Sequence, residues 1–309
     1  MNFHRFRIFI VSLILSLCGT AQPKNPLFYH VYADYGMTSD KTTVIHQDFQ
    51  GYIWIGTEEG LNKFVSYADQ NFDQYRSSRS DSTSLDNDYI TALFEDSNRN
   101  LWIGSLTGLC RYNRNFDNFE RICNKHKSLM NKRINAITEQ NGQLWVATDE
   151  LLYVYDYKSD SIQKTYEWEN EIGKKVSFNA LYTSKDHIWV GTSDGLYLIE
   201  EMKINPISGF EGLDITSISL SKESNLFIGS RNSGLYILNM QGEIVQLTTD
   251  TSPSIASNQV NSVLTRGNGD IWIATNSGLT FYYPTTNTAT NYQYDFNNVF
   301  GLSDHEVRH

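Results

Sequence analysis

The sequence predicts an all-β protein, a β-propeller of four-stranded antiparallel blades with six full repeats plus a partial seventh. A phrase of the type Ile-Trp-Ile-Gly-Thr occurs six times, at residues 53–57, 101–105, 144–148, 188–192, 226–230 and 271–275. The aromatic positions of successive phrases lie 48, 43, 44, 38 and 45 residues apart. Tyrosine, phenylalanine and tryptophan are abundant, as is typical of strands. A period in the forties with several short strands per unit is typical of a propeller blade.

The first repeat shows how each unit is built. We expect strands at 43–46, 53–56, 61–65 and 72–75, separated by an Asp-x-x-Gly turn at 48–51 and a glycine hairpin at 58–60. The second strand is a continuous apolar run, which indicates burial on both sheet faces. We therefore expect its tryptophan to pack between neighbouring blades rather than to stack on a ligand.

Two units depart from the pattern, and both ends are incomplete. Unit three has Asp149-Glu150-Leu151 where the other hairpins have glycine, and unit five has Phe227 in place of tryptophan. Residues 28–32 resemble a lone fourth strand, and residues 300–304 resemble the start of another unit. We expect a truncated piece of a seven-bladed ring that lacks two strands, and a closed six-bladed ring is the alternative.

The N-terminus predicts export. Arg5 and Arg7 precede an apolar run at 8–17, and Gly19 and Ala21 supply the small residues of a cleavage site before Gln22. We expect a signal peptide at 1–21, with an uncleaved anchor as the alternative, and a propeller domain at 22–309. The formal net charge is −10 with no basic stripe, which argues against direct binding of nucleic acid.

Two cysteines remain after residue 21, Cys110 and Cys123. Both flank a predicted turn at 115–117, so they could face each other across a hairpin. In an oxidising compartment such a pair could form a disulfide, and two separate buried thiols are the alternative.

The repeats resemble the two-component regulator propeller family. Asp48, Gly51, the phrase 53–57 and Gly60-Leu61-Asn62-Lys63-Phe64 match its pattern, and the resemblance covers about residues 28–309. It implies the N-terminal periplasmic sensor of a Bacteroidetes hybrid two-component system, attached to the inner membrane in a full-length receptor. Such propellers bind breakdown products of polysaccharides. The histidine kinase that relatives carry in their C-terminal parts is absent from this chain.

The sequence offers little catalytic chemistry. Residues 305–309 read His-Glu-x-x-His, but no supporting helix is predicted, so we interpret the match as accidental. We expect no catalytic residue, metal or cofactor. For ligand binding, the inter-blade loops at one end of the propeller are favoured, because loops cluster there. Trp168 lies beside such a loop, and Arg231 and Asn232 form a hairpin tip at the same end.

Three functions remain open at this point. The first is a sensor that binds an oligosaccharide, with the missing C-terminal parts of the receptor as partners. The second is a propeller enzyme that acts on polysaccharide. The third is a scaffold that binds other proteins. We also expect the isolated chain to be marginally stable or prone to form homodimers, because an incomplete ring exposes strand edges and apolar faces.

Overall fold

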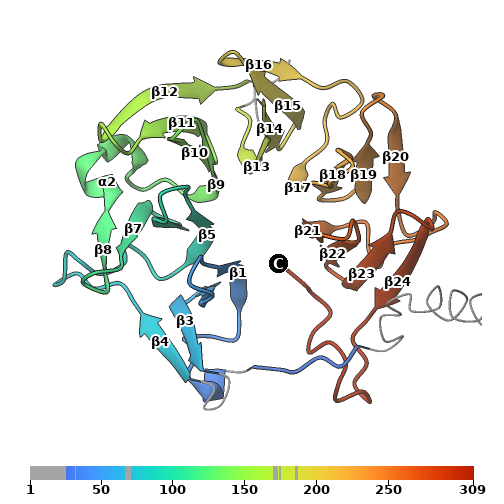
Figure 1. Ribbon diagram of the computed structural model, residues 1–309, viewed down its shortest axis with the longest axis horizontal. Helices are drawn as coiled ribbons and strands as arrows, with labels where there is room; N and C mark the ends of the chain where they lie inside the picture. Colours follow the sequence, from blue (N-terminus) through green and yellow to red (C-terminus); the bar gives the residue numbers. More distant parts are fainter. Residues whose placement is uncertain (1–25, 32, 67–70, 170–172, 174, 185–186) are drawn as a thin grey trace, which may run out of the picture.

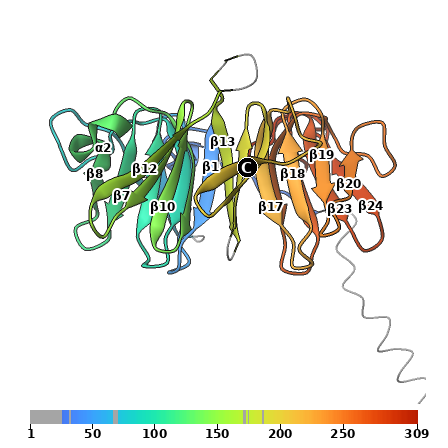
Figure 2. The ribbon, with the colours of Figure 1, turned by 90° about the horizontal axis from the view of Figure 1, so that it is seen from above.

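Six antiparallel sheets of four strands each stand in a ring, as Figures 1 and 2 show. The structure is a computed structural model, and it describes residues 26–31, 33–66, 71–169, 173, 175–184 and 187–309. Within these residues the strand order in every sheet follows the sequence, and the first strand is the innermost. The predicted all-β propeller of four-stranded blades is therefore confirmed.

The strands of blades 1 to 3 are β1 (Thr42–Gln47), β2 (Ile53–Thr57), β3 (Gly60–Ser66), β4 (Asn71–Tyr75), β5 (Ile90–Glu95), β6 (Leu101–Ser105), β7 (Leu109–Asn113), β8 (Asn118–Arg121), β9 (Ile134–Gln140), β10 (Gln143–Thr148), β11 (Leu151–Asp156) and β12 (Ser161–Glu167). Short helices η1 (Ala33–Tyr35), α2 (Ile122–Lys125) and η2 (Lys127–Leu129) lie in the connections.

The strands of blades 4 to 6 are β13 (Phe178–Ser184), β14 (His187–Thr192), β15 (Gly195–Glu200), β16 (Lys203–Pro206), β17 (Ile215–Leu220), β18 (Leu226–Ser230), β19 (Leu235–Leu238), β20 (Ile244–Leu247), β21 (Val260–Thr265), β22 (Ile271–Thr275), β23 (Gly278–Tyr283) and β24 (Thr288–Tyr292). The innermost strands of consecutive blades contact each other, from β1 and β5 through to β17 and β21.

Four of the six repeated aromatic residues are buried in the core between blades, as the apolar run predicts, whereas Trp189 and Trp272 are only partly buried. Trp54 and Trp102 are fully buried, and Phe227 fills the same place in blade 5. The ring nitrogens of Trp54 and Trp102 each donate to a buried aspartate of the preceding turn, Asp48 and Asp96, both at 2.9 Å. Each aspartate thus satisfies the polar atom that burial of a tryptophan would otherwise leave unpaired.

Unit three makes its hairpin without glycine. The hydroxyl of Thr148 accepts from the backbone N–H of Leu151 at 3.0 Å and donates to the carbonyl of Leu151 at 2.8 Å. In blade 1 the corresponding hydroxyl, Thr57, also donates to the turn, at Gly60. A buried hydroxyl therefore closes the turn in both units, and the predicted strand pair β10–β11 forms.

The described residues of the structure do not form the predicted partial seventh blade. Residues 26–31 and 293–309 contain no strand, although they run through the gap between blades 6 and 1 (Figure 1). The backbone N–H of Phe28 donates to the carbonyl of Phe300 at 3.0 Å, and a ring nitrogen of His30 lies 2.8 Å from the carbonyl oxygen of Gly301. Within the second segment, an isolated bridge joins Tyr294 to Leu302. The predicted fourth strand at 28–32 is thus an extended segment over its described residues, 28–31.

The predicted signal peptide at 1–21 lies outside the described residues. Among those that are described, no helix combines the length and the apolar character needed to cross a membrane.

Candidate functional site

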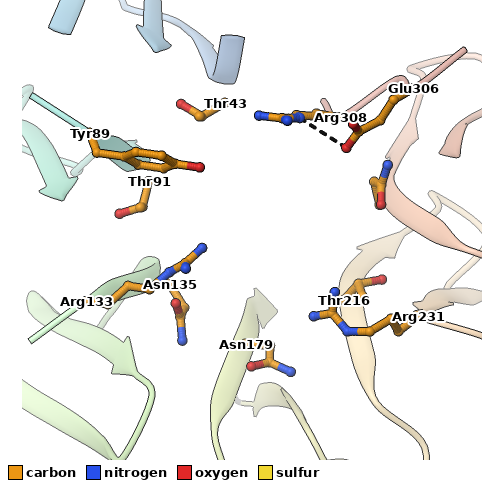
Figure 3. Close-up of a pocket in the computed structure, with 11 residues that line it drawn as sticks. Thr43, Tyr89, Thr91, Arg133, Asn135, Asn179, Thr216, Arg231, Glu306 and Arg308 are labelled. Carbon is orange, nitrogen blue, oxygen red and sulfur yellow. Dashed lines mark hydrogen bonds and ion pairs between the residues drawn. The ribbon is translucent and has the colours of Figure 1, made fainter. Parts of the chain in front are cut away.

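A polar cavity of about 310 Å³ opens at one end of the propeller axis, and we call it the axial mouth. Residues from all six blades and from the C-terminal segment line it, and Figure 3 shows their side chains around an open centre. The lining consists of Thr43, Tyr89, Thr91, Arg133, Asn135, Asn179, Thr216, Arg231, Asn261, Glu306 and Arg308.

The regular part of this lining follows from the repeat. The second residue of every innermost strand faces the mouth, and it is always threonine or asparagine: Thr43, Thr91, Asn135, Asn179, Thr216 and Asn261. Five of these side chains also donate to a backbone carbonyl farther along the ring, at 2.6–3.1 Å, the acceptors being Ile90, Phe178, Ile215, Val260 and Val307. The position therefore serves both blade packing and the mouth surface.

Thr91 is the exception in this series. Its hydroxyl is buried and has no hydrogen-bond partner in the described part of the chain. A buried hydroxyl without a partner costs roughly 1–3 kcal/mol. Among the described residues, the Thr91 side chain is thus the one member of the series that makes no hydrogen bond along the ring.

The irregular part of the lining carries the charge. Arg133 precedes β9, Arg231 lies in the hairpin between β18 and β19, and Arg308 lies in the C-terminal segment. Arg308 donates to Glu306 at 3.1 Å and to Glu58 at 3.0 Å. Hydrogen bonding to Arg308 lowers the pKa of the Glu58 carboxyl, which stays ionised at neutral pH.

The three predicted ligand residues do not meet in one place. Arg231 lines the axial mouth, and its Nε donates to Asp214 at 2.6 Å. Asn232 is exposed beside it but is not among the lining residues. Trp168 packs edge-on against Tyr197, with ring centroids 5.3 Å apart, and donates to its hydroxyl at 3.1 Å. Its contacts are those of a residue that joins blades 3 and 4.

The other mouth residues were not singled out from the sequence. Arg133 directly precedes β9 and Arg308 lies in the strandless C-terminal segment, and neither position identifies an axial side chain before the fold is known. A Thr or Asn recurs in the sequence as the second residue of every innermost strand. This repetition would have identified six of the lining residues.

The two cysteines do not form a disulfide in the structure. Both are buried free thiols. Cys110 lies on β7 and its thiol contacts Asp86 at 3.2 Å, whereas Cys123 lies in α2 rather than at the end of the predicted strand. Burial, with the charge of Asp86, raises the pKa of the Cys110 thiol well above its usual range. This thiol is therefore protonated and unreactive at neutral pH.

Residues 305–309 form no helix, so the His-Glu-x-x-His match lacks the geometry of a zinc site. Within the described residues, no group of three or more His, Cys, Asp or Glu side chains could hold a metal ion.

Known structures share this architecture. The extracellular domain of a hybrid two-component system from B. thetaiotaomicron has a TM-score of 0.77 at 20% identity, over 92% of this chain and 39% of that one. A second such domain from the same organism has a TM-score of 0.51 at 17% identity, over 84% and 41%. The chain thus spans about two fifths of the length of both domains.

An enzyme is also similar in fold. Virginiamycin B lyase from Staphylococcus aureus has a TM-score of 0.64 at 14% identity, over 83% of this chain and 85% of that one. No curated protein matches the sequence. Residues 84–107 match the family described as "Two component regulator propeller", which is the family that the repeats resemble. The chain is therefore a six-bladed propeller that carries the two-component regulator propeller repeat.

Proposed function

We propose that this propeller is the exported ligand-sensing part of a two-component phosphorelay receptor, and that the axial mouth binds an oligosaccharide. The observation that carries the proposal is the mouth itself, where polar side chains from every blade converge on one cavity. The repeat family and the extracellular two-component domains of the same fold support the sensor role.

The mouth suits a polyhydroxylated ligand. Asn135 and Asn179 use their amide N–H groups on protein acceptors, which leaves their amide oxygens to accept from ligand hydroxyls. The hydroxyl of Tyr89 can both donate and accept. Sugars present the same mixture of donors and acceptors, and a propeller end offers the concave surface that binds them.

We propose binding without turnover. The one carboxylate among the described lining residues, Glu306, is engaged by Arg308. Acid–base cleavage of a glycosidic bond ordinarily uses two carboxyl groups on opposite sides of the bond. In a full-length receptor, the signal would pass to parts that lie outside this chain.

A thermal-shift screen tests the sensor proposal. The purified chain is melted with oligosaccharides released from plant and host polysaccharides, and a true ligand raises the melting temperature by mass action. Tyr89→Phe, which removes one mouth hydroxyl, should weaken binding severalfold. Tyr29→Phe should not, because Tyr29 is 81% exposed and outside the mouth.

Each function gives its own result. If cleavage products of the oligosaccharide appear after long incubation, the protein is an enzyme and the sensor proposal is wrong. Binding that is indifferent to Tyr89→Phe would move the site away from the mouth.

A further inference from the structure

The axial mouth gathers three guanidinium groups in a chain whose formal net charge is −10. Arg133, Arg231 and Arg308 come from three distant parts of the sequence, and Figure 3 shows all three around the same open centre. Because acidic residues outnumber basic ones in this protein, the gathering of three arginines at the axis is a local reversal of charge.

Two of these arginines are partly engaged. Arg231 uses Nε on Asp214, and Arg308 uses Nε and Nη1 on Glu306 and Glu58. A guanidinium has five N–H donors, so both retain N–H groups on their remaining nitrogens. Asp149 accepts from Asn135, and Glu150 beside it pairs with Lys132 at 2.5 Å.

Arg133 differs from the other two. It has no hydrogen-bond or ion-pair partner in the described part of the chain, and its side chain is exposed at the rim of the mouth. The acids that flank the mouth are held by Arg231, Arg308 and Asn135. The positive charge of Arg133 is therefore the one that no flanking carboxylate neutralises directly, and its planar fork suits a carboxylate.

We infer that the mouth binds a sugar acid, an oligosaccharide that carries carboxylate groups. One uronate carboxylate pairs with Arg133 and another takes N–H donors from Arg231 across the mouth (Figure 3), while sugar hydroxyls meet Tyr89 and the asparagine oxygens. This inference rests on the proposed function and adds the charge class of the ligand.

Calorimetric titration of the full chain tests it. The probes are trimers of galacturonic acid and of mannuronic acid and a hyaluronan tetramer, each compared with a neutral oligosaccharide of the same length. We expect at least one acidic probe to bind tenfold or more tightly than its neutral counterpart. Its affinity should fall as salt rises, because salt screens an exposed ion pair.

Two variants locate the contact. Arg133→Gln should lose about tenfold in affinity for the acidic probe and keep its melting temperature, because Arg133 has no partner to lose. Arg99→Gln, a change at an exposed arginine in the β5–β6 turn at the other end of the propeller, should bind as the wild type does.

The two proposals fail differently. Equal affinity for acidic and neutral probes, or an Arg133→Gln variant that binds like the wild type, overturns the sugar-acid inference and leaves the sensor proposal standing. The inference is also overturned if no acidic probe binds while a neutral oligosaccharide does. If neither class binds and Tyr89→Phe changes nothing in the wider screen, both proposals are overturned.

Discussion

The fourth residue of each repeated phrase is glycine or alanine for a steric reason. A Cβ added at Gly56, Gly104, Gly191 or Gly229 would lie 2.6–2.7 Å from a methyl group of the first residue of the next innermost strand. That residue is Ile90, Ile134, Ile215 or Val260, and all four are β-branched. Ala147 is tolerated in blade 3, where the next strand begins with the unbranched Phe178 in the same buried cluster.

Gly104→Ala should destabilise the protein by about 1–3 kcal/mol, the usual cost of overpacking a core. The new methyl group would lie 2.7 Å from Cγ2 and 2.8 Å from Cβ of Ile134, and Cβ cannot move away unless the strand itself moves. Urea unfolding followed by fluorescence measures the change. Gly267→Ala is the control, because its added Cβ meets only Lys222 Nζ at 3.9 Å, and we expect a change within about 0.5 kcal/mol. Equal effects of the two variants would refute the steric explanation.

Asp48 is the buried acid of blade 1. It accepts from Trp54, from the backbone N–H groups of Gln50 and Tyr52, and from Arg114 at 2.8 Å. Burial raises the pKa of this carboxyl, but the bonds from Trp54 and Arg114 outweigh burial, so the pKa is lowered overall. Folding therefore favours the ionised form.

This shift predicts a specific pH dependence. A carboxyl whose pKa is lower in the folded state contributes stability above its unfolded pKa of about 4 and loses it as pH falls toward the folded pKa. The free energy of unfolding of the wild type should therefore fall more steeply below pH 4 than that of Asp48→Asn. Urea titrations between pH 2.5 and 7 measure both slopes. Asp73→Asn, at an exposed site on β4, should keep the wild-type slope. Parallel curves for wild type and Asp48→Asn would contradict the prediction.

At the scale of elements, Arg114 joins blades 1 and 2. It lies in the turn between β7 and β8 and binds Asp48 of blade 1 at 2.8 Å and Glu95 of its own blade at 3.1 Å. The Arg114 side chain is 20% exposed, and its two partners are 0% and 8% exposed. It also lies over the Phe49 ring, 4.9 Å from the centroid. The contact thus fixes one blade against the next.

Arg114→Met should destabilise the protein by about 3 kcal/mol, because it keeps the aliphatic packing but leaves the buried Asp48 without its cation and removes the shorter of the two ion pairs of Glu95. Arg99→Met is a closely matched control. Arg99 pairs with the same Glu95 at 3.6 Å and lies over the same Phe49, but its side chain is 62% exposed. An exposed pair contributes at most about 1 kcal/mol. Thermal and urea unfolding of both variants should separate them, and equal losses would show that burial does not matter here.

The elements that the sequence predicts well are those whose residues pack locally. The repeated phrase correctly located the second strand of each blade, because a strand that is buried on both faces is a continuous apolar run in the sequence. The turn aspartates were read as turn formers, but their bonds to Trp54 and Trp102 join residues six positions apart and require the hairpin geometry. Cys123 was misplaced because β8 ends at Arg121, and the one-turn helix that follows has no sequence signal of its own.

At the scale of the molecule, the mouth could be predicted only in part. The end of the propeller was predicted, and Arg231 was named. Arg133 and Arg308 were not, because their approach to the axis depends on how the innermost strands are placed around the ring. Trp168 was predicted to contact a ligand because it falls outside the repeat, but its side chain packs between blades 3 and 4.

The segment after blade 6 repeats the connection between blades 1 and 2. Isolated parallel bridges join Ser77 to Leu85 and Tyr294 to Leu302, at the same separation in sequence. The backbone N–H of Phe119 on β8 donates to Thr83, as that of Phe28 donates to Phe300. Asn261 donates to Val307 as Thr43 donates to Ile90. Phe28 therefore lies where the outermost strand of another blade would be, and Val307 lies where its innermost strand would be. We propose that this position accepts further strands.

The open position should make the isolated chain associate with itself. An apolar cavity of about 200 Å³ lies beside blade 6, lined in part by Trp272, Leu279 and Val307 and by Leu264, which is 62% exposed. Trp272 is only partly buried, as Trp189 of blade 4 is, whereas Trp54 and Trp102 are fully buried. Apolar surface next to unpaired strand edges favours pairing with a second copy.

Sedimentation velocity should therefore show a fraction of dimer that increases with protein concentration. Leu264→Glu should abolish it, because a charge buried against a second apolar face costs several kcal/mol. Phe116→Glu should leave the dimer intact, since Phe116 is 75% exposed but lies in the β7–β8 turn, away from the gap. A wild-type monomer at every concentration would mean that residues 26–31 and 293–309 cover the position adequately. A dimer unaffected by Leu264→Glu would place the association elsewhere on the ring.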